Sequence, residues 1–145
     1  MAEKTRVTTY SPKNIRMEVG KQTVQGFSED SFVSIELQGD GTSFAVGADG
    51  EVVRAISASE VYTVKIKLLQ GSATNDYLQK LYDMDRADDT MGKGIVGLSI
   101  TDPLGNEKFT GGSCWIAKPA SWARGKEQTD REWELTVADG KFGDA

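Results

Sequence analysis

The chain contains no histidine and only one cysteine, Cys114, among its 145 residues. Histidine is the commonest general base near neutral pH and the commonest metal ligand in proteins, so the usual basis for both kinds of site is missing. A single cysteine forms neither an internal disulfide nor a thiolate metal cluster. Because no histidine is present to activate its thiol, Cys114 is predicted to be a buried, small apolar residue rather than a nucleophile. We therefore expect no catalytic residue, metal site or cofactor.

Long apolar runs and an excess of basic charge are missing as well. No stretch approaches the roughly 20 apolar residues that cross a bilayer, and the polar residues 1–6 lack the apolar core of a signal peptide. We expect a protein with no membrane partner that is made in a reducing cytoplasm. The 17 basic and 22 acidic residues give a net charge of −5, which argues against a surface that grips nucleic acid by its phosphates.

What the sequence does contain is alternation of apolar and polar residues with a period of two. It recurs in residues 15–19, 33–37, 62–68, 96–101 and 132–137, and more briefly in 23–27 and 108–118. Alternation places one set of side chains on each face of a sheet. The pattern predicts one mainly β domain over residues 1–145, an antiparallel β-sandwich or barrel. Its polar ends, 1–9 and 139–145, are expected to order only against a neighbour.

Residues 74–87 form the one convincing helix in the sequence. Leu78, Leu81 and Tyr82 make an apolar stripe at helical spacing, and either Ser72 or Thr74 is expected to cap the free amides at its start. A single short helix with one apolar stripe is expected to flank the sheet.

Acidic residues gather near the end of this helix, where the helix dipole makes negative charge unfavourable. They are Asp83, Asp85, Asp88 and Asp89. The cluster is either a solvated helix end or a set of charges that pairs with lysine or arginine on an adjacent copy. Lys65 and Lys67, on the outer face of the strand predicted at 62–68, are candidates for contacts of the same kind.

A hairpin is predicted at residues 42–56, with strands at 42–46 and 51–56 bounded by glycine turns. Its apolar residues, with one arginine among them, are Phe44, Val46, Val52, Val53, Arg54 and Ile56. A lone hairpin is only marginally stable in water, so an apolar one usually lies against something. The sequence leaves open whether it folds back on its own core or projects as an arm whose open edges pair with another subunit.

Three segments resemble the tail tube proteins of contractile-tailed bacteriophages. They are Tyr-Ser-Pro-Lys-Asn at 10–14, Val-Gly-Ala-Asp-Gly-Glu-Val at 46–52, and Leu-Leu-Gln-Gly-Ser-Ala-Thr-Asn at 68–75 entering the helix. The resemblance extends over residues 10–137 in order and spacing. It implies a β-sandwich or barrel with one flanking helix and a projecting hairpin arm. It also implies assembly into six-membered rings that stack as a hollow tube.

In that family the arm and the N-terminal segment contact neighbouring subunits or rings. The resemblance therefore implies contact roles for the six hairpin residues, and we add Lys65, Lys67, Asp85, Asp88 and Asp89 as candidates. The implied partners are tail sheath, baseplate and tail terminator proteins, in a virion tail assembled in the host cytoplasm. Genomic DNA would pass through the bore without specific binding. Six copies at −5 each carry −30, and any part of that charge lining the bore would repel phosphates.

Two other functions stay open. One is a tube protein of a related bacterial contractile injection machine. The other is a monomeric β-sandwich that binds carbohydrate through Trp115, Trp122 and Trp133, although the alternation around Trp115 and Trp133 favours core packing. Glu132 and Glu134 share a strand face, as a glycosidase pair might, but any solvated strand offers the same pattern. Oligomeric state separates the tube protein from the monomeric module.

Overall fold

The computed structural model describes residues 10–28, 32–87 and 94–144. These residues form one α-helix, one short 3-10 helix and ten strands. In chain order the elements are η1 (Pro12–Asn14), β1 (Arg16–Val19), β2 (Gln22–Thr23), β3 (Val33–Leu37), β4 (Thr42–Val46), β5 (Val52–Ile56), β6 (Tyr62–Leu68), α1 (Thr74–Arg86), β7 (Val96–Asp102), β8 (Glu107–Lys118), β9 (Arg131–Val137) and β10 (Lys141–Gly143).

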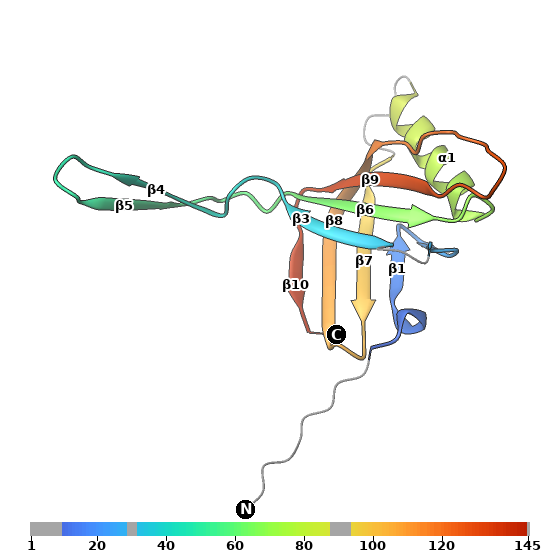
Figure 1. Cartoon of the computed structure of the whole chain (residues 1–145), viewed down its shortest axis with the longest axis horizontal. Coiled ribbons are helices and arrows are strands. Elements are labelled where there is room, and N and C mark those ends of the chain that lie inside the picture. The colour runs from blue at the N-terminus through green and yellow to red at the C-terminus, as the bar shows by residue number, and fades with distance from the viewer. Residues whose placement is uncertain (1–9, 29–31, 88–93, 145) are drawn as a thin grey trace, which may run out of the picture.

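Eight of the strands belong to one bent antiparallel sheet. Its order is β2-β1-β7-β8-β9-β6-β3, with β10 paired to β8. In Figure 1, β1, β7, β8 and β10 run side by side in one layer, and β9, β6 and β3 cross them in a second layer. The long strand β8 joins the layers, because it pairs with β10 at residues 108–110 and with β9 at residues 114–118. The predicted mainly β sandwich with one flanking helix is confirmed.

Glycine is required where β8 passes from one layer to the other. A Cβ atom on Gly111 would overlap the side chain of Val137, which lies on β9. Immediately after it, the backbone N–H of Ser113 donates a hydrogen bond of 3.0 Å to Oδ1 of Asp139. The absence of a side chain at Gly111 thus lets the end of β9 approach β8 closely.

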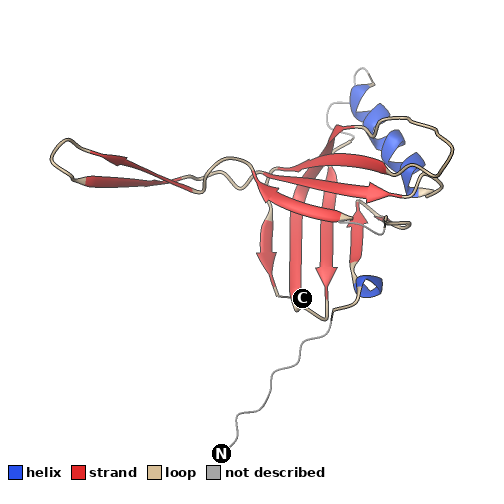
Figure 2. Ribbon diagram, in the orientation of Figure 1, coloured by secondary structure: helices blue, strands red, loops and turns tan. Residues whose placement is uncertain are grey.

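Apolar side chains from both layers meet in a single core. The fully buried ones include Met17, Val19, Val64, Ile66, Leu68, Leu78, Trp133, Leu135 and Val137. Helix α1 covers one end of the sandwich (Figure 2), with Leu78 and Leu81 buried against it. The Tyr77 hydroxyl donates a hydrogen bond of 3.0 Å to the carbonyl oxygen of Val19. The predicted apolar stripe therefore attaches the helix to the sheet.

The ends of several elements differ from the sequence prediction. Thr74 does not cap the helix, because its hydroxyl accepts a hydrogen bond from the Gln25 N–H. Ser72 Oγ instead accepts a hydrogen bond of 3.2 Å from the Thr74 N–H. The strand predicted at 23–27 is only the two-residue β2, and Phe27 beyond it makes an isolated bridge to Leu68.

The C-terminal residues expected to be loose include a strand. β10 pairs with the first half of β8, and the Phe142 ring lies 4.8 Å from the Phe109 ring and 5.8 Å from the Tyr62 ring, measured between centroids. One aromatic side chain attaches this short, otherwise polar segment to the body. The prediction that it orders only against a neighbour was wrong for residues 141–143.

Candidate assembly surfaces

The hairpin of β4 and β5 projects from the body of the molecule as an arm. Figures 1 and 2 show it extending well beyond both layers of the sandwich. Its strands pair only with each other, and every residue of both is exposed. Phe44 is 73% exposed and Ile56 is 74% exposed. Of the two alternatives left open by the sequence, the structure shows the projecting one.

The arm has two unlike faces. Cross-strand register pairs Thr42 with Ile56, Phe44 with Arg54, and Val46 with Val52. Because partners in register lie on the same face, these six side chains form one surface, which we call the apolar face. The opposite, small face carries Ser43, Ala45, Val53 and Ala55. Five of the six predicted contact residues of the arm therefore share a face, and Val53 does not.

Lys65 and Lys67 lie on the outer face of β6, as predicted from the alternation, but each faces an acid in its own sheet. The register places Lys65 opposite Glu134 and Lys67 opposite Glu132. Oppositely charged residues in register stabilise a sheet by a few tenths of a kcal/mol, about 0.2–1. The arrangement balances charge within the face. It also places Glu132 and Glu134 opposite lysines in the sheet register.

Only part of the predicted acidic cluster falls within the described residues. Asp85 is exposed in the last turn of α1, and its side chain lies where a Cβ atom on Gly94 would be. Asp88 and Asp89 lie outside the described residues. Asp83, also exposed, accepts a hydrogen bond of 3.1 Å from the Gln79 side chain one turn earlier.

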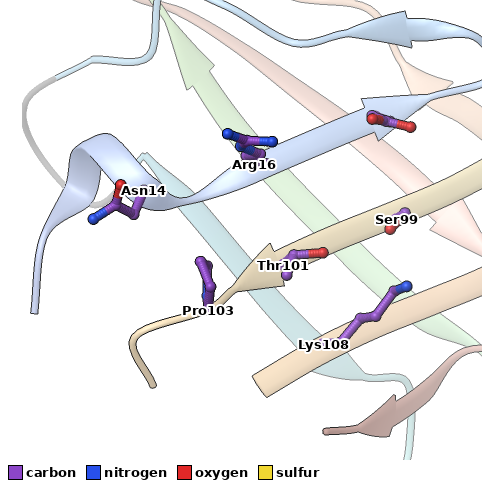
Figure 3. A pocket seen from close by; sticks show the side chains of 7 residues that line it. Asn14, Arg16, Ser99, Thr101, Pro103 and Lys108 are labelled. Carbon is purple, nitrogen blue, oxygen red and sulfur yellow. The ribbon is translucent and has the colours of Figure 1, made fainter. Parts of the chain in front are cut away.

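A polar concavity of about 520 Å³ lies on the outer face of β1, β7 and β8 (Figure 3). Arg16, Glu18, Ser99, Thr101 and Lys108 line it, with Asn14 and Pro103 at its end. Its charged and hydroxyl side chains are one acid, two bases and two hydroxyls. Nothing in this set pairs a nucleophile with an activating base, so the concavity offers polar contacts rather than chemistry.

A second, apolar groove opens where β3 crosses the other layer. Ile15, Val33, Ile35 and Ile100 line its 420 Å³ part, and Phe109 and Phe142 continue it toward β10. Asp102 and Glu107 lie at the rim of both parts, and Lys108 lies beside them in the second part. No local pattern in the sequence predicts this groove, since it combines residues from four separate strands. The one local signal was Phe142, an aromatic residue in a polar tail.

The groups that could carry chemistry are buried or dispersed. Cys114 is fully buried, as predicted. Burial, and secondarily the charge of Asp139, raises the pKa of its thiol to about 12, so the nucleophilic thiolate is disfavoured. Among the described residues, no three histidine, cysteine, aspartate or glutamate side chains are grouped to hold a metal ion. None of the helices formed by these residues is long and apolar enough to cross a membrane.

The three tryptophans do not form a shared platform. Trp133 is fully buried in the core, which confirms the prediction for that residue. Trp115 is only half-buried and alternates with the core residues Cys114 and Ile116, so the prediction that it packs in the core was wrong. Trp122 is 70% exposed, with the Arg124 guanidinium 4.4 Å from its ring centroid.

Comparison with known proteins identifies the family. The sequence model of the bacteriophage PhiTE tail tube protein matches residues 9–141. "Structural protein ORF10" of Pseudomonas phage KPP10 is 27% identical over 143 residues, covering 94% of this chain and 82% of that protein.

Solved structures of contractile systems share the fold at low sequence identity. The tube-terminating cap of the anti-feeding prophage has a TM-score of 0.63 at 10% identity, covering 99% of this chain and 97% of that one. The sheath/tube terminator of an extracellular contractile injection system has a TM-score of 0.60 at 11% identity, covering 98% and 99%. A chain of its sheath–tube complex has a TM-score of 0.58 at 10% identity, covering 94% and 93%. Since the family match spans nearly the whole sequence, this chain belongs to the bacteriophage PhiTE tail tube protein family and has the structural role of a tail tube protein.

Proposed function

We propose that this protein forms six-membered rings that stack into the tube of a contractile phage tail, and that the tube conducts the genome into the host. Neighbouring copies contact one another through the arm, chiefly by way of Phe44, Val46, Val52, Arg54 and Ile56 on its apolar face, with a smaller contribution from Val53 on the small face. Lys65, Lys67, Asp85, Asp88 and Asp89 remain candidates for further contacts between copies. The protein acts as a building block of the virion and not as an enzyme.

The observation that carries this proposal is the arm. A two-stranded hairpin is marginally stable in water on its own, and this one exposes Phe44 and Ile56 at 73% and 74%. Both outer edges of the hairpin also lack a strand partner within the described part of the chain. An exposed apolar ribbon with open edges is a template for pairing with another chain. In a stacked tube, a neighbouring copy of this protein is available to pair with every arm.

Passage of DNA without specific binding is consistent with the charge on the sheet faces. A duplex is gripped by clusters of basic side chains that displace its counterions. On β6 and β9, Lys65 and Lys67 are instead matched by Glu134 and Glu132. The face of β1, β7 and β8 mixes Arg16 and Lys108 with Glu18 and uncharged hydroxyls. A bore lined by either face would hold DNA weakly.

We further propose that the tube lies inside a tail sheath and ends in terminator and baseplate proteins, with assembly in the host cytoplasm. The similar solved chains come from a tube-terminating cap and a sheath–tube complex, which supports partners of this kind. The same similarity favours one other candidate, a tube protein of a bacterial contractile injection machine. A carbohydrate-binding module finds no support, because Trp133 is buried in the core.

Negative-stain microscopy of the purified protein, with sedimentation over a wide concentration range, tests the proposal. We expect rings with six-fold symmetry at low concentration and hollow tubes at high concentration. A protein that remains monomeric throughout, even with baseplate protein added as an initiator, would refute it. Rings of another symmetry would refute the six-membered arrangement alone.

A further inference from the structure

The apolar groove runs beside the unpaired edge of β3. Figure 1 shows the ends of β7, β8 and β10 extending past β3. Ile35 of β3 is half-buried and provides one wall of the groove, and the nearly buried Ile100 and Phe109, 8% and 1% exposed, lie beneath it. The groove is therefore a place where the core continues beyond the last strand of the sheet.

β3 is an edge strand, so its backbone amides on the side away from β6 face no other strand of the described structure. The N–H of Gln38 donates to the Val61 carbonyl, and the N–H of Lys67 donates to the Phe32 carbonyl, each at 2.9 Å. Hydrogen-bonded pairs alternate along an antiparallel ladder. The amides of Val33, Ile35 and Leu37 consequently point away from β6, toward the open edge. The side chains of Val33 and Ile35 are also the ones that line the groove.

The arm has the matching alternation. The N–H of Gly47 donates to the Glu51 carbonyl at 2.7 Å, and the N–H of Ser57 donates to the Gly41 carbonyl at 2.9 Å. The amides of the odd-numbered residues of β4 are thus used inside the hairpin. Those of Thr42, Phe44 and Val46 point to its outer edge, and their side chains lie on the apolar face.

This alternation makes strand direction decisive. In an antiparallel ladder, residues whose amides face the shared boundary stand directly opposite one another, with side chains on the same face. Antiparallel pairing of β4 with β3 would therefore place the apolar face over the groove. Parallel pairing offsets the ladder by one residue and would place the small face there instead. The apolar lining of the groove selects the antiparallel arrangement.

We propose that the groove is the receptor for the arm of a second copy of this chain, with β4 of that copy added antiparallel to the open edge of β3. This inference rests on the proposed assembly and names its contact. Figure 1 shows the arm pointing away from the body, so the arm does not occupy the groove of its own chain. Phe44 then packs against the half-buried Ile35, and β5 lies along the far rim.

Charge complementarity supports the same arrangement. Asp102 and Glu107 stand opposite each other in the β7–β8 register, and like charges in that position repel. Arg54 is the one basic residue of the arm strands and lies on the apolar face opposite Phe44. With β4 against β3, Arg54 on β5 reaches the two carboxylates at the rim. Its guanidinium relieves their repulsion, and the small face carries no acid that would compete for it.

Disulfide trapping in assembled tubes tests the pairing. The proposed pairing would set residues whose amides point away from the shared boundary opposite one another: Ser34 and Glu36 of β3 opposite Ser43 and Ala45 of β4. In such non-hydrogen-bonded pairs the Cα atoms are about 4.5 Å apart, which is within the range for a disulfide. We expect at least one of the four double variants, for instance Glu36→Cys with Ala45→Cys, to give covalent multimers on oxidation. The single variants, in which Cys114 stays buried, give the background level of crosslinking.

The matched control is Glu36→Cys with Thr42→Cys, because Thr42 is next to Ser43 but lies on the other face. Crosslinking through Thr42 would mean parallel pairing and overturn the inference. Crosslinking of Glu36→Cys with Ala55→Cys would place β5 beside β3 and would also overturn the inference. So would crosslinking of Glu36→Cys with Thr5→Cys within one chain, because the N-terminal segment would then occupy the groove. Tubes that form without any of these crosslinks overturn this inference alone, whereas a protein that never assembles overturns the proposed function as well.

A charge exchange tests the rim independently. Arg54→Glu is expected to raise the critical concentration for tube formation by about tenfold or more, as for reversal of a paired interfacial charge. Glu107→Lys is the suitable second change, because Asp102 also accepts a hydrogen bond from Gly105 in its own turn. The double variant should recover most of the loss. Equal loss in the single and double variants would contradict the proposed contact.

Discussion

At the scale of single residues, burial decides the properties of Cys114. Its pKa rises from 9.0 to about 12, chiefly because burial disfavours the thiolate and secondarily because of Asp139. A raised pKa means that the folded protein binds this proton more tightly than the unfolded chain does. The resulting stabilisation is complete below pH 9.0 and is lost as the pH rises toward 12.

We therefore expect the free energy of unfolding to fall more steeply above pH 9.0 in the natural protein than in Cys114→Ala. Urea unfolding followed by circular dichroism, repeated at several pH values, measures the two slopes. The absolute stability of the variant also drops because of the small cavity, so the comparison is between slopes. Identical slopes would show that the thiol does not titrate differently in the two states.

Trp133 connects the sheet to the helix by a buried hydrogen bond. Its indole N–H donates to Oδ1 of Asn75 at 2.9 Å, and the two residues are 0% and 2% exposed. Trp133→Phe leaves the amide oxygen without a partner and creates a cavity, which should reduce the free energy of unfolding by about 2–4 kcal/mol. The control is Trp122→Phe, an exposed position, where the change should stay within about 0.5 kcal/mol. Similar effects of both changes, measured by circular dichroism in urea, would contradict this account.

At the scale of elements, the two faces of the arm are expected to contribute unequally. Phe44→Ser and Ile56→Ser remove large side chains from the apolar face, whereas Val53→Ser changes only the small face. We expect the first two to prevent tube growth and the third to leave most of it, with all three proteins folded because the arm lies outside the core. Electron microscopy scores the tubes. A loss of tubes in Val53→Ser equal to that in Ile56→Ser would show that both faces are buried on assembly.

The elements also show where local sequence patterns suffice. Strands β3, β6 and β9 and the apolar stripe of α1 were predicted because their alternation reflects burial on one side. β10 was not, since a three-residue strand is stabilised by contacts with Phe109 and Tyr62, far away in the sequence. Trp115 shows the opposite case. The predicted alternation with Cys114 and Ile116 is present, but those two residues face the core and Trp115 lies on the outer face of β8.

At the scale of the whole molecule, one sheet and one core predict a single cooperative unit. All the strands except β4 and β5 belong to the same sheet of the described structure. Unfolding in urea should therefore be two-state, with coincident transitions by circular dichroism and by tryptophan fluorescence. Non-coincident transitions would indicate that the two layers unfold separately.

Deleting residues 42–56 and joining Gly39 to Ser57 through a short turn should leave this cooperative unit intact. Because both arm strands are fully exposed, the free energy of unfolding should change by no more than about 0.5 kcal/mol. Tube formation should be lost. If the deletion unfolds the protein, the arm belongs to the folding unit, and the arm's separate role in assembly is refuted.

The sequence by itself determined the antiparallel strands, the flanking helix, the burial of Cys114 and the existence of the hairpin, because each depends on periodicity or turn chemistry within a few residues. Only the tertiary structure decided that the hairpin projects and that Lys65 and Lys67 face acids of their own sheet. It also decided that Ile35, Ile100 and Phe142 meet in one groove. These features depend on which strands become neighbours, and strand neighbours are set by packing of the whole core rather than by any local pattern.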